Sequence, residues 1–157
     1  MASPKQMLYA WARPVSFAEW AGDHTFVTDY DQPFKDNPPR RSWYCAGGVY
    51  SRDSNGVRPL LSAEADIKFA EFICTPDDPE KREWPEFKST AGIEYGINGV
   101  CHHIANRILY AAQSSGPPPL VNEARGYKFH EFVYMLLGYG QYGTNEPQWR
   151  DRLARYR

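Results

Sequence analysis

The chain has 157 residues, which is most simply one domain with room for a hydrophobic core. Its 18 Lys and Arg residues nearly balance its 19 Asp and Glu residues, so charge gives no reason to expect binding to nucleic acid or to an anionic membrane. No apolar run approaches the length of a membrane span. The 13 prolines, 12 glycines and many aromatic residues suit a compact fold with frequent turns.

The N-terminus and the cysteines bear on where the protein works. Residues 1–6 lack the charged start and the long apolar core of a secretory signal, so we expect synthesis in the cytoplasm, or export by a route without a cleaved signal. Cys45, Cys74 and Cys101 form no C-x-x-C pair. One disulfide between Cys45 and Cys74 is conceivable, but reduced thiols are the default expectation.

The first half of the chain predicts a mixture of short strands and helices. An apolar patch at residues 7–13 is interrupted by Pro14, and the capping-box spacing of Ser16 and Glu19 predicts a helical turn at 16–21. Residues 25–28 are typical of a strand, and His24 directly precedes it. Further on, we expect a loop at 31–41, a strand at 42–45, a hairpin turn at 55–56, a helix at 62–72 capped by Ser62, and a surface loop at 75–85.

Residues 92–112 hold the most informative pattern. Three glycines, the last of them Gly99, lead to a helix in which Cys101, Ile104, Ala105, Ile108 and Ala112 form one apolar stripe. Asn98 is the expected N-cap, which places Cys101 in the first turn. The unpaired N–H groups and the dipole of that turn favour negative charge, so a thiol there ionises more easily. The alternative is that Cys101 is a small buried hydrophobe.

The C-terminal part predicts two more helices. Residues 114–119 read as a stiff, proline-rich connector, and residues 127–137 as a long apolar helix that Gly138 and Gly140 end. The tail at 148–157 reads as a short basic helix around Trp149 and Leu153, with its arginines on a solvated face. We find no internal repeat and no domain boundary.

The leading pair of functional residues is Cys101 with His24. A nucleophilic cysteine needs a histidine close in space, and not in sequence, to accept and return its proton. The alternative for His24 is a structural histidine at a strand end. A metal centre is disfavoured, because successive helical side chains diverge by about 100° and Cys101, His102 and His103 cannot all face one ion. His102 is expected to face solvent or the helix cap, His103 to lie near the pair, and His130 to be structural.

Three segments together resemble a known family. Gly-Asp-His-Thr-Phe-Val at 22–27, Trp-Tyr-Cys-Ala-Gly-Gly at 43–48 and the helix start Gly-Val-Cys-His-His at 99–103 resemble bacterial proteins of circularly permuted NlpC-like, papain-like type. Similar domains occur among type VI secretion effectors that attack peptidoglycan. The resemblance covers roughly residues 22–112 and implies that Cys101 is the nucleophile and His24 the base. His103 stands where the family pattern has Gln, and Ala46 where it has Trp. The third, orienting group is left open between Ser42, Tyr44 and Asp29.

These observations lead to one expectation for the fold and several for function. We expect residues 1–157 to form a single α+β, papain-like domain of the permuted NlpC type, with a small antiparallel sheet packed on the cysteine-bearing helix. The expected activity is hydrolysis of an amide, most concretely a peptidoglycan peptide, by Cys101 and His24 without metal or cofactor. The resemblance further implies delivery by a secretion machine to a target periplasm, and an immunity protein as partner. The alternatives are a deamidase, an acyltransferase, or a binding module with an inert Cys101.

Overall fold

The computed structural model describes residues 6–17, 20–28, 31, 42–43, 57–74, 93, 97–113, 116–143 and 146–157. Four strands and four helices lie within these ranges: β1 (Gln6–Phe17), β2 (Trp20–Thr28), β3 (Ser42–Trp43), β4 (Arg58–Ala65), α1 (Ile67–Cys74), α2 (Cys101–Ala112), α3 (Tyr127–Leu136) and α4 (Glu146–Tyr156). They confirm the expected α+β class. None of these helices has the length and hydrophobicity of a membrane-spanning segment.

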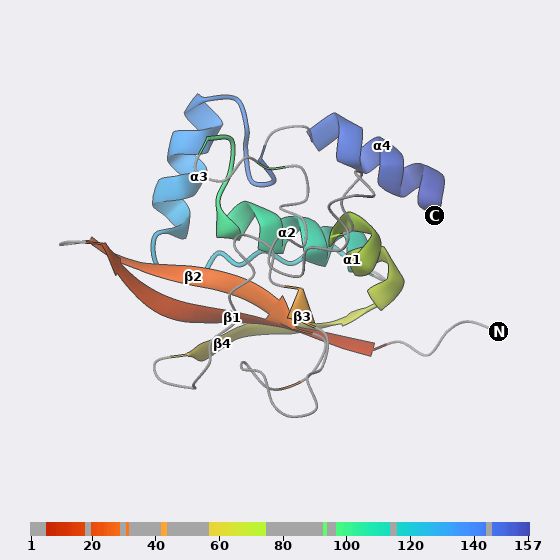
Figure 1. Ribbon diagram of the computed structural model, residues 1–157, viewed down its shortest axis with the longest axis horizontal. Coiled ribbons are helices and arrows are strands. Elements are labelled where there is room, and N and C mark those ends of the chain that lie inside the picture. The colour runs from red at the N-terminus through yellow and green to blue at the C-terminus, as the bar shows by residue number, and fades with distance from the viewer. Residues whose placement is uncertain are drawn as a thin grey trace, which may run out of the picture.

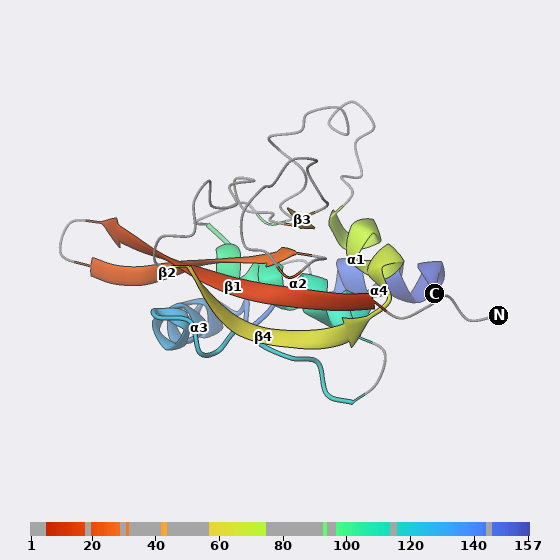
Figure 2. The same cartoon turned by 90° about the horizontal axis from the view of Figure 1, so that it is seen from below.

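The strands form one antiparallel sheet with the order β3-β2-β1-β4. β1 and β2 are a long hairpin in which Phe17 pairs with Trp20, and the small residues Ala10 and Ala12 of β1 are fully buried. All four helices lie on one side of the sheet, with α3 at one end and α1 and α4 at the other (Figure 1). Seen from below, the sheet runs across the molecule with β4 at one edge (Figure 2).

α2 is the central helix of the core. Its residues Ile104, Ala105 and Ile108 pack with Leu8 of β1 and Val27 of β2 in one buried cluster. Because burying a large aliphatic side chain stabilises a fold by about 1.5–3 kcal/mol, this apolar stripe is enough to hold α2 on the sheet. The helix predicted from the stripe is confirmed, with Cys101 as its first residue.

Two predicted elements in the N-terminal half are wrong. Ser16 lies in β1 and Ala21 in β2, paired with each other, where a helical turn at 16–21 was expected. Ser62 lies in β4 and pairs with Tyr9, so the helix expected at 62–72 begins only at Ile67 and ends at Cys74. In both places the local sequence has a capping pattern, but the residues pair with a neighbouring strand instead. Tertiary contacts outweigh weak local propensities.

The other predicted strands and helices that fall within the described residues agree with the structure. The strand at 25–28 is confirmed as the second half of β2, and the two C-terminal helices are confirmed as α3 and α4. Gly138 and Gly140 adopt positive φ angles of 88° and 63° just after α3, as expected for a helix end. β3 confirms the start of the strand at 42–45. The turn at 55–56, the loop at 75–85 and nearly all of the loop at 31–41 lie outside the described residues, as does the side chain of Cys74.

Candidate functional site

Cys101 sits at the N-terminal end of α2 with its side chain inside the protein. The residue is only 4 % exposed. Val100 is the N-cap in an extended conformation, so the prediction of Asn98 as the cap is wrong by two residues. A Cβ on Gly99 would lie 2.9 Å from two side-chain carbons of Ile93, so the close approach expected of the glycines before the helix is real at this position.

β2 brings Asp23, His24 and Thr25 against the helix start. The Cys101 Sγ lies 3.9 Å from the backbone oxygen of Asp23. His24 and Thr25 lie close enough to the thiol to lower its pKa through hydrogen bonding, and His24 also lowers it through its charge. The two residues singled out from the sequence, Cys101 and His24, are therefore neighbours in the fold, although they lie far apart in the chain.

The electrostatic surroundings of Cys101 favour its thiolate form. Burial alone would raise the pKa of the Cys101 thiol. The hydrogen bond and the positive charge of His24, with further hydrogen bonds from Thr25, outweigh burial and place the pKa of Cys101 below its ordinary value. A thiolate paired with an imidazolium is the nucleophilic form of such a pair.

His102 corrects one expectation of the sequence analysis. Its ring is buried, 1 % exposed, and does not face solvent or the helix cap. Its Nδ1 lies 3.1 Å from Thr25 Oγ1 and 3.8 Å from the Cys101 Sγ. Burial lowers the pKa of His102 to about 4, so the ring is neutral near pH 7. His102 thus forms one wall of the thiol site.

His103 has a structural role at the same helix start. The backbone N–H of Val100 donates to His103 Nδ1 over 2.9 Å, which is the hydrogen bond that a Gln or Glu makes from this position in a capping box. The ring packs edge-on against Tyr134 of α3, and burial lowers the pKa of His103 to about 4.

A buried ion cluster holds the strand end next to His24. The side chain of Asp23 is fully buried and accepts hydrogen bonds from the guanidinium groups of Arg58 and Arg125, with shortest distances of 2.6 and 3.2 Å. The backbone N–H of Arg125 also donates to this carboxylate, and the N–H of Asp23 donates to the carbonyl of Arg125. Burial would raise the pKa of Asp23, but the two arginines lower it below its usual range. The cluster ties β2 to β4 and to the segment before α3.

Sequence reasoning missed this cluster and the contact of Thr25 with the thiol. Asp23 and Thr25 flank His24, so their position beside the candidate base was visible in the sequence. Nothing in the sequence signalled Arg58 and Arg125, because they come from segments far from His24 and from each other. Only the folded sheet brings them to one carboxylate.

The side chains of all three candidates for the third, orienting group lie outside the described residues. His24 Nε2 is buried, and no residue of the described part of the chain hydrogen-bonds to it. Of the three candidates, Ser42 pairs with Thr28 through its backbone, while its side chain lies outside the described residues. Tyr44 and Asp29 also lie outside them, as does Cys45.

The described ranges show no metal centre at the thiol. These ranges hold no group of three or more His, Cys, Asp or Glu side chains that could bind a metal ion. His130 packs its ring against His102, with 5.1 Å between the ring centroids.

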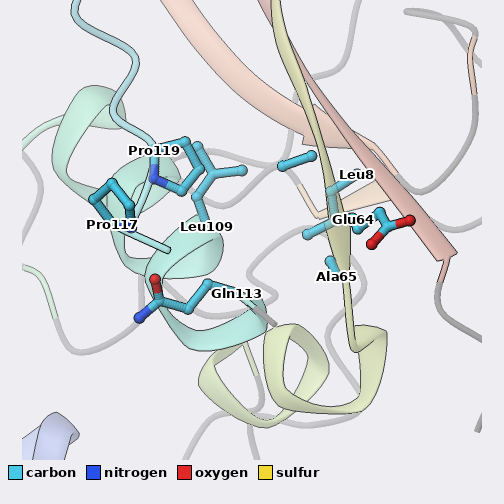
Figure 3. Close-up of a pocket in the computed structure, with 8 residues that line it drawn as sticks. Leu8, Glu64, Ala65, Leu109, Gln113, Pro117 and Pro119 are labelled. Atoms are coloured by element: carbon cyan, nitrogen blue, oxygen red, sulfur yellow. The ribbon is translucent and has the colours of Figure 1, made fainter. Parts of the chain in front are cut away.

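A cavity of about 200 Å³ lies at the other end of α2, between Leu109 and Gln113 on one side and the ends of β1 and β4 on the other (Figure 3). It does not reach Cys101, which begins the helix.

Comparisons with protein-family models, with curated proteins and with solved structures found no match to this chain.

Proposed function

We propose that the protein is a cysteine hydrolase of the papain-like, permuted NlpC type, with Cys101 as the nucleophile and His24 as its acid and base. One observation supports this proposal: the thiol at the first residue of α2 lies beside His24 of β2, whose hydrogen bonding and charge lower the pKa of the thiol. A sheet strand that supplies the histidine to a helix N-terminus is the spatial arrangement expected for papain-like sites, whichever residue comes first in the chain.

The chemistry follows from the positions of the groups. The Cys101 thiolate attacks the amide carbonyl and forms a carbon–sulfur bond, and protonated His24 gives its proton to the leaving amine as the carbon–nitrogen bond breaks. Water then attacks the thioester while His24 takes a proton from it, and the carbon–sulfur bond breaks, which releases the acid and restores the Cys101 thiolate beside protonated His24. The N–H groups of Cys101 and His102 belong to the first turn and have no acceptor within the helix, so they support an oxyanion.

The substrate class is proposed on the resemblance of residues 22–27 and 99–103. Peptidoglycan peptides are the amide substrates of similar effector domains, and that resemblance supports delivery by a secretion system into a target periplasm. An immunity protein is the partner that such delivery requires. Deamidation or acyl transfer would use the same thioester, so the products decide between them: new amine termini indicate hydrolysis, and ammonia indicates deamidation.

One observation favours a second candidate function. Cys101 is 4 % exposed and His24 is 9 % exposed. A substrate therefore reaches the thiol only if neighbouring residues move. A binding module that retains the fold with an inert thiol would show this burial without any chemistry. The two candidates differ in one measurable property, the reactivity of the thiol.

The test is the pH dependence of Cys101 alkylation by iodoacetamide, followed by mass mapping, in the wild type and in His24→Ala. We expect Cys101 to react well below neutral pH, where Cys45 and Cys74 react slowly, because its pKa is lowered. His24→Ala should move the profile of Cys101 upward. His130→Gln is the matched control, since it removes a half-buried histidine that touches His102 and not the thiol.

Either result leads to a decision. If the profile of Cys101 shifts in His24→Ala and stays in place in His130→Gln, purified peptidoglycan is the next substrate, with release of amine termini as the readout. If all three thiols share one profile, or Cys101 alone is protected at every pH, the pair has no chemical role. The binding module is then the better assignment.

A further inference from the structure

α3 carries large apolar residues on two opposite faces, and those of one face remain exposed. The inner face carries the buried Tyr127 and Tyr134, which contact His102 and His103 of α2. The outer face carries large apolar residues that are each more than half exposed, with Leu136 the most exposed at 71 %. We call this set the outer stripe: Phe129, Phe132, Met135, Leu136 and Leu137.

The spacing of the outer stripe suits packing against another helix. Phe129, Phe132 and Leu136 lie at i, i+3 and i+7, so they form one ridge along α3. An exposed apolar patch of this kind marks an interaction surface. α3 also lies at one end of the helical layer (Figure 1).

We propose that the outer stripe is a dimer interface, in which α3 packs antiparallel against α3 of a second copy of this chain. Half-exposed side chains of these sizes expose roughly 500 Å² of apolar surface in all. A standard interface buries about 800 Å² on each partner, somewhat more than half of it apolar, so one outer stripe supplies about the apolar area that a stable dimer needs.

A second copy matches the chemistry of the stripe better than the other occupants. In an antiparallel pair related by a twofold axis, Phe129 of one helix faces Leu136 of the other, and Phe132 lies near the axis. The only charged residues of α3 are Lys128 and Glu131, which carry opposite signs, so two copies meet without a net charge. A helix that lies in a membrane surface is rich in Lys and Arg on its polar face, and α3 has a single lysine.

The experiment measures the mass of the full-length protein in solution by light scattering, from micromolar to sub-millimolar concentration. We expect a species of twice the 18.0 kDa chain mass that dissociates on dilution. Leu136→Glu should weaken the dimer by at least tenfold in dissociation constant, because it places a charge in an apolar contact. Ala154→Glu, which adds the same charge at an exposed position of α4, should leave the dimer intact.

A second pair of variants tests the antiparallel arrangement. Leu136→Glu and Phe129→Lys should each be monomeric alone, and their mixture should form a dimer, because Glu and Lys then face each other across the interface. A mixture that stays monomeric overturns this arrangement. A wild type that is monomeric at every concentration overturns the dimer itself. So does a monomer that sediments with lipid vesicles through the outer stripe, which would assign the surface to a membrane.

Discussion

Asp23 illustrates how one residue can serve the site without touching a substrate. Its carboxylate holds two arginines from distant segments, and its backbone oxygen contacts the Cys101 Sγ at 3.9 Å. The side chain of Asp23 is fully buried, whereas those of Arg58 and Arg125 remain 40 and 50 % exposed. The Asp23 carboxylate therefore needs the arginines to replace its lost hydration, while water still solvates the arginines. The position of His24, the next residue, follows from this cluster.

Asp23→Asn should lower the free energy of unfolding by about 1–3 kcal/mol, because a buried charge-assisted cluster becomes a set of weaker neutral hydrogen bonds. Urea denaturation at pH 7 measures the change. Glu123→Gln is the control, since Glu123 is exposed and meets Arg58 only through its backbone oxygen. Equal midpoints for the two variants would contradict the structural role of the cluster.

At the scale of elements, the helix start that carries Cys101 depends on a close contact between three segments. Residues 97–100, Ile93 and Gly143 pack together so tightly that a Cβ on Gly143 would lie 3.0 Å from the backbone oxygen of Asn98. Gly143 also has a φ of 78°, which L-residues rarely adopt. Gly138 has a similar φ of 88°, but a Cβ there would meet nothing within 4 Å.

These two glycines form a matched pair for mutation. Gly138→Ala should cost about 1–2 kcal/mol of stability, the cost of a left-handed conformation alone. Gly143→Ala should cost more, because the new methyl group also pushes on Asn98 and Ile93. Thermal denaturation of the two variants measures the difference. If Gly143→Ala is no worse than Gly138→Ala, the packing before Cys101 is looser than described.

At the scale of the whole molecule, three histidines between α2 and α3 make stability depend on pH. Burial lowers the pKa values of His102, His103 and His130 from an ordinary 6.5 to about 4. The rings of His102 and His130 are in contact, and the charges of Asp23 and Arg107 reach His102 and His103 respectively. The folded protein therefore takes up protons less readily than the unfolded chain.

The sign of the effect follows from this difference. As the pH falls from 6.5 towards 4, the unfolded chain binds protons first, so the free energy of unfolding decreases, by about 3 kcal/mol for one such histidine. Urea midpoints measured from pH 7 to pH 4 should fall through this window. His103→Gln retains the cap and should flatten the decline. A wild-type midpoint that stays constant down to pH 4 would show that these histidines are solvated.

The sequence by itself determined the elements whose signal is local and periodic. The apolar stripe from Cys101 to Ala112 placed α2 correctly, and the glycines after residue 137 placed the end of α3, because helical spacing and positive φ angles are properties of a short segment. The choice of Cys101 and His24 also came from the sequence, although their chemical role stays a prediction.

Only the tertiary structure decided what depends on pairing between distant segments. Ser16 and Ser62 read as helix caps, yet both lie in strands, since pairing with neighbouring strands supplies more hydrogen bonds and burial than an isolated turn does. The burial of His102, the capping by His103 and the convergence of Arg58 and Arg125 on Asp23 likewise arise from packing. A local pattern carries no information about which distant surface will cover it.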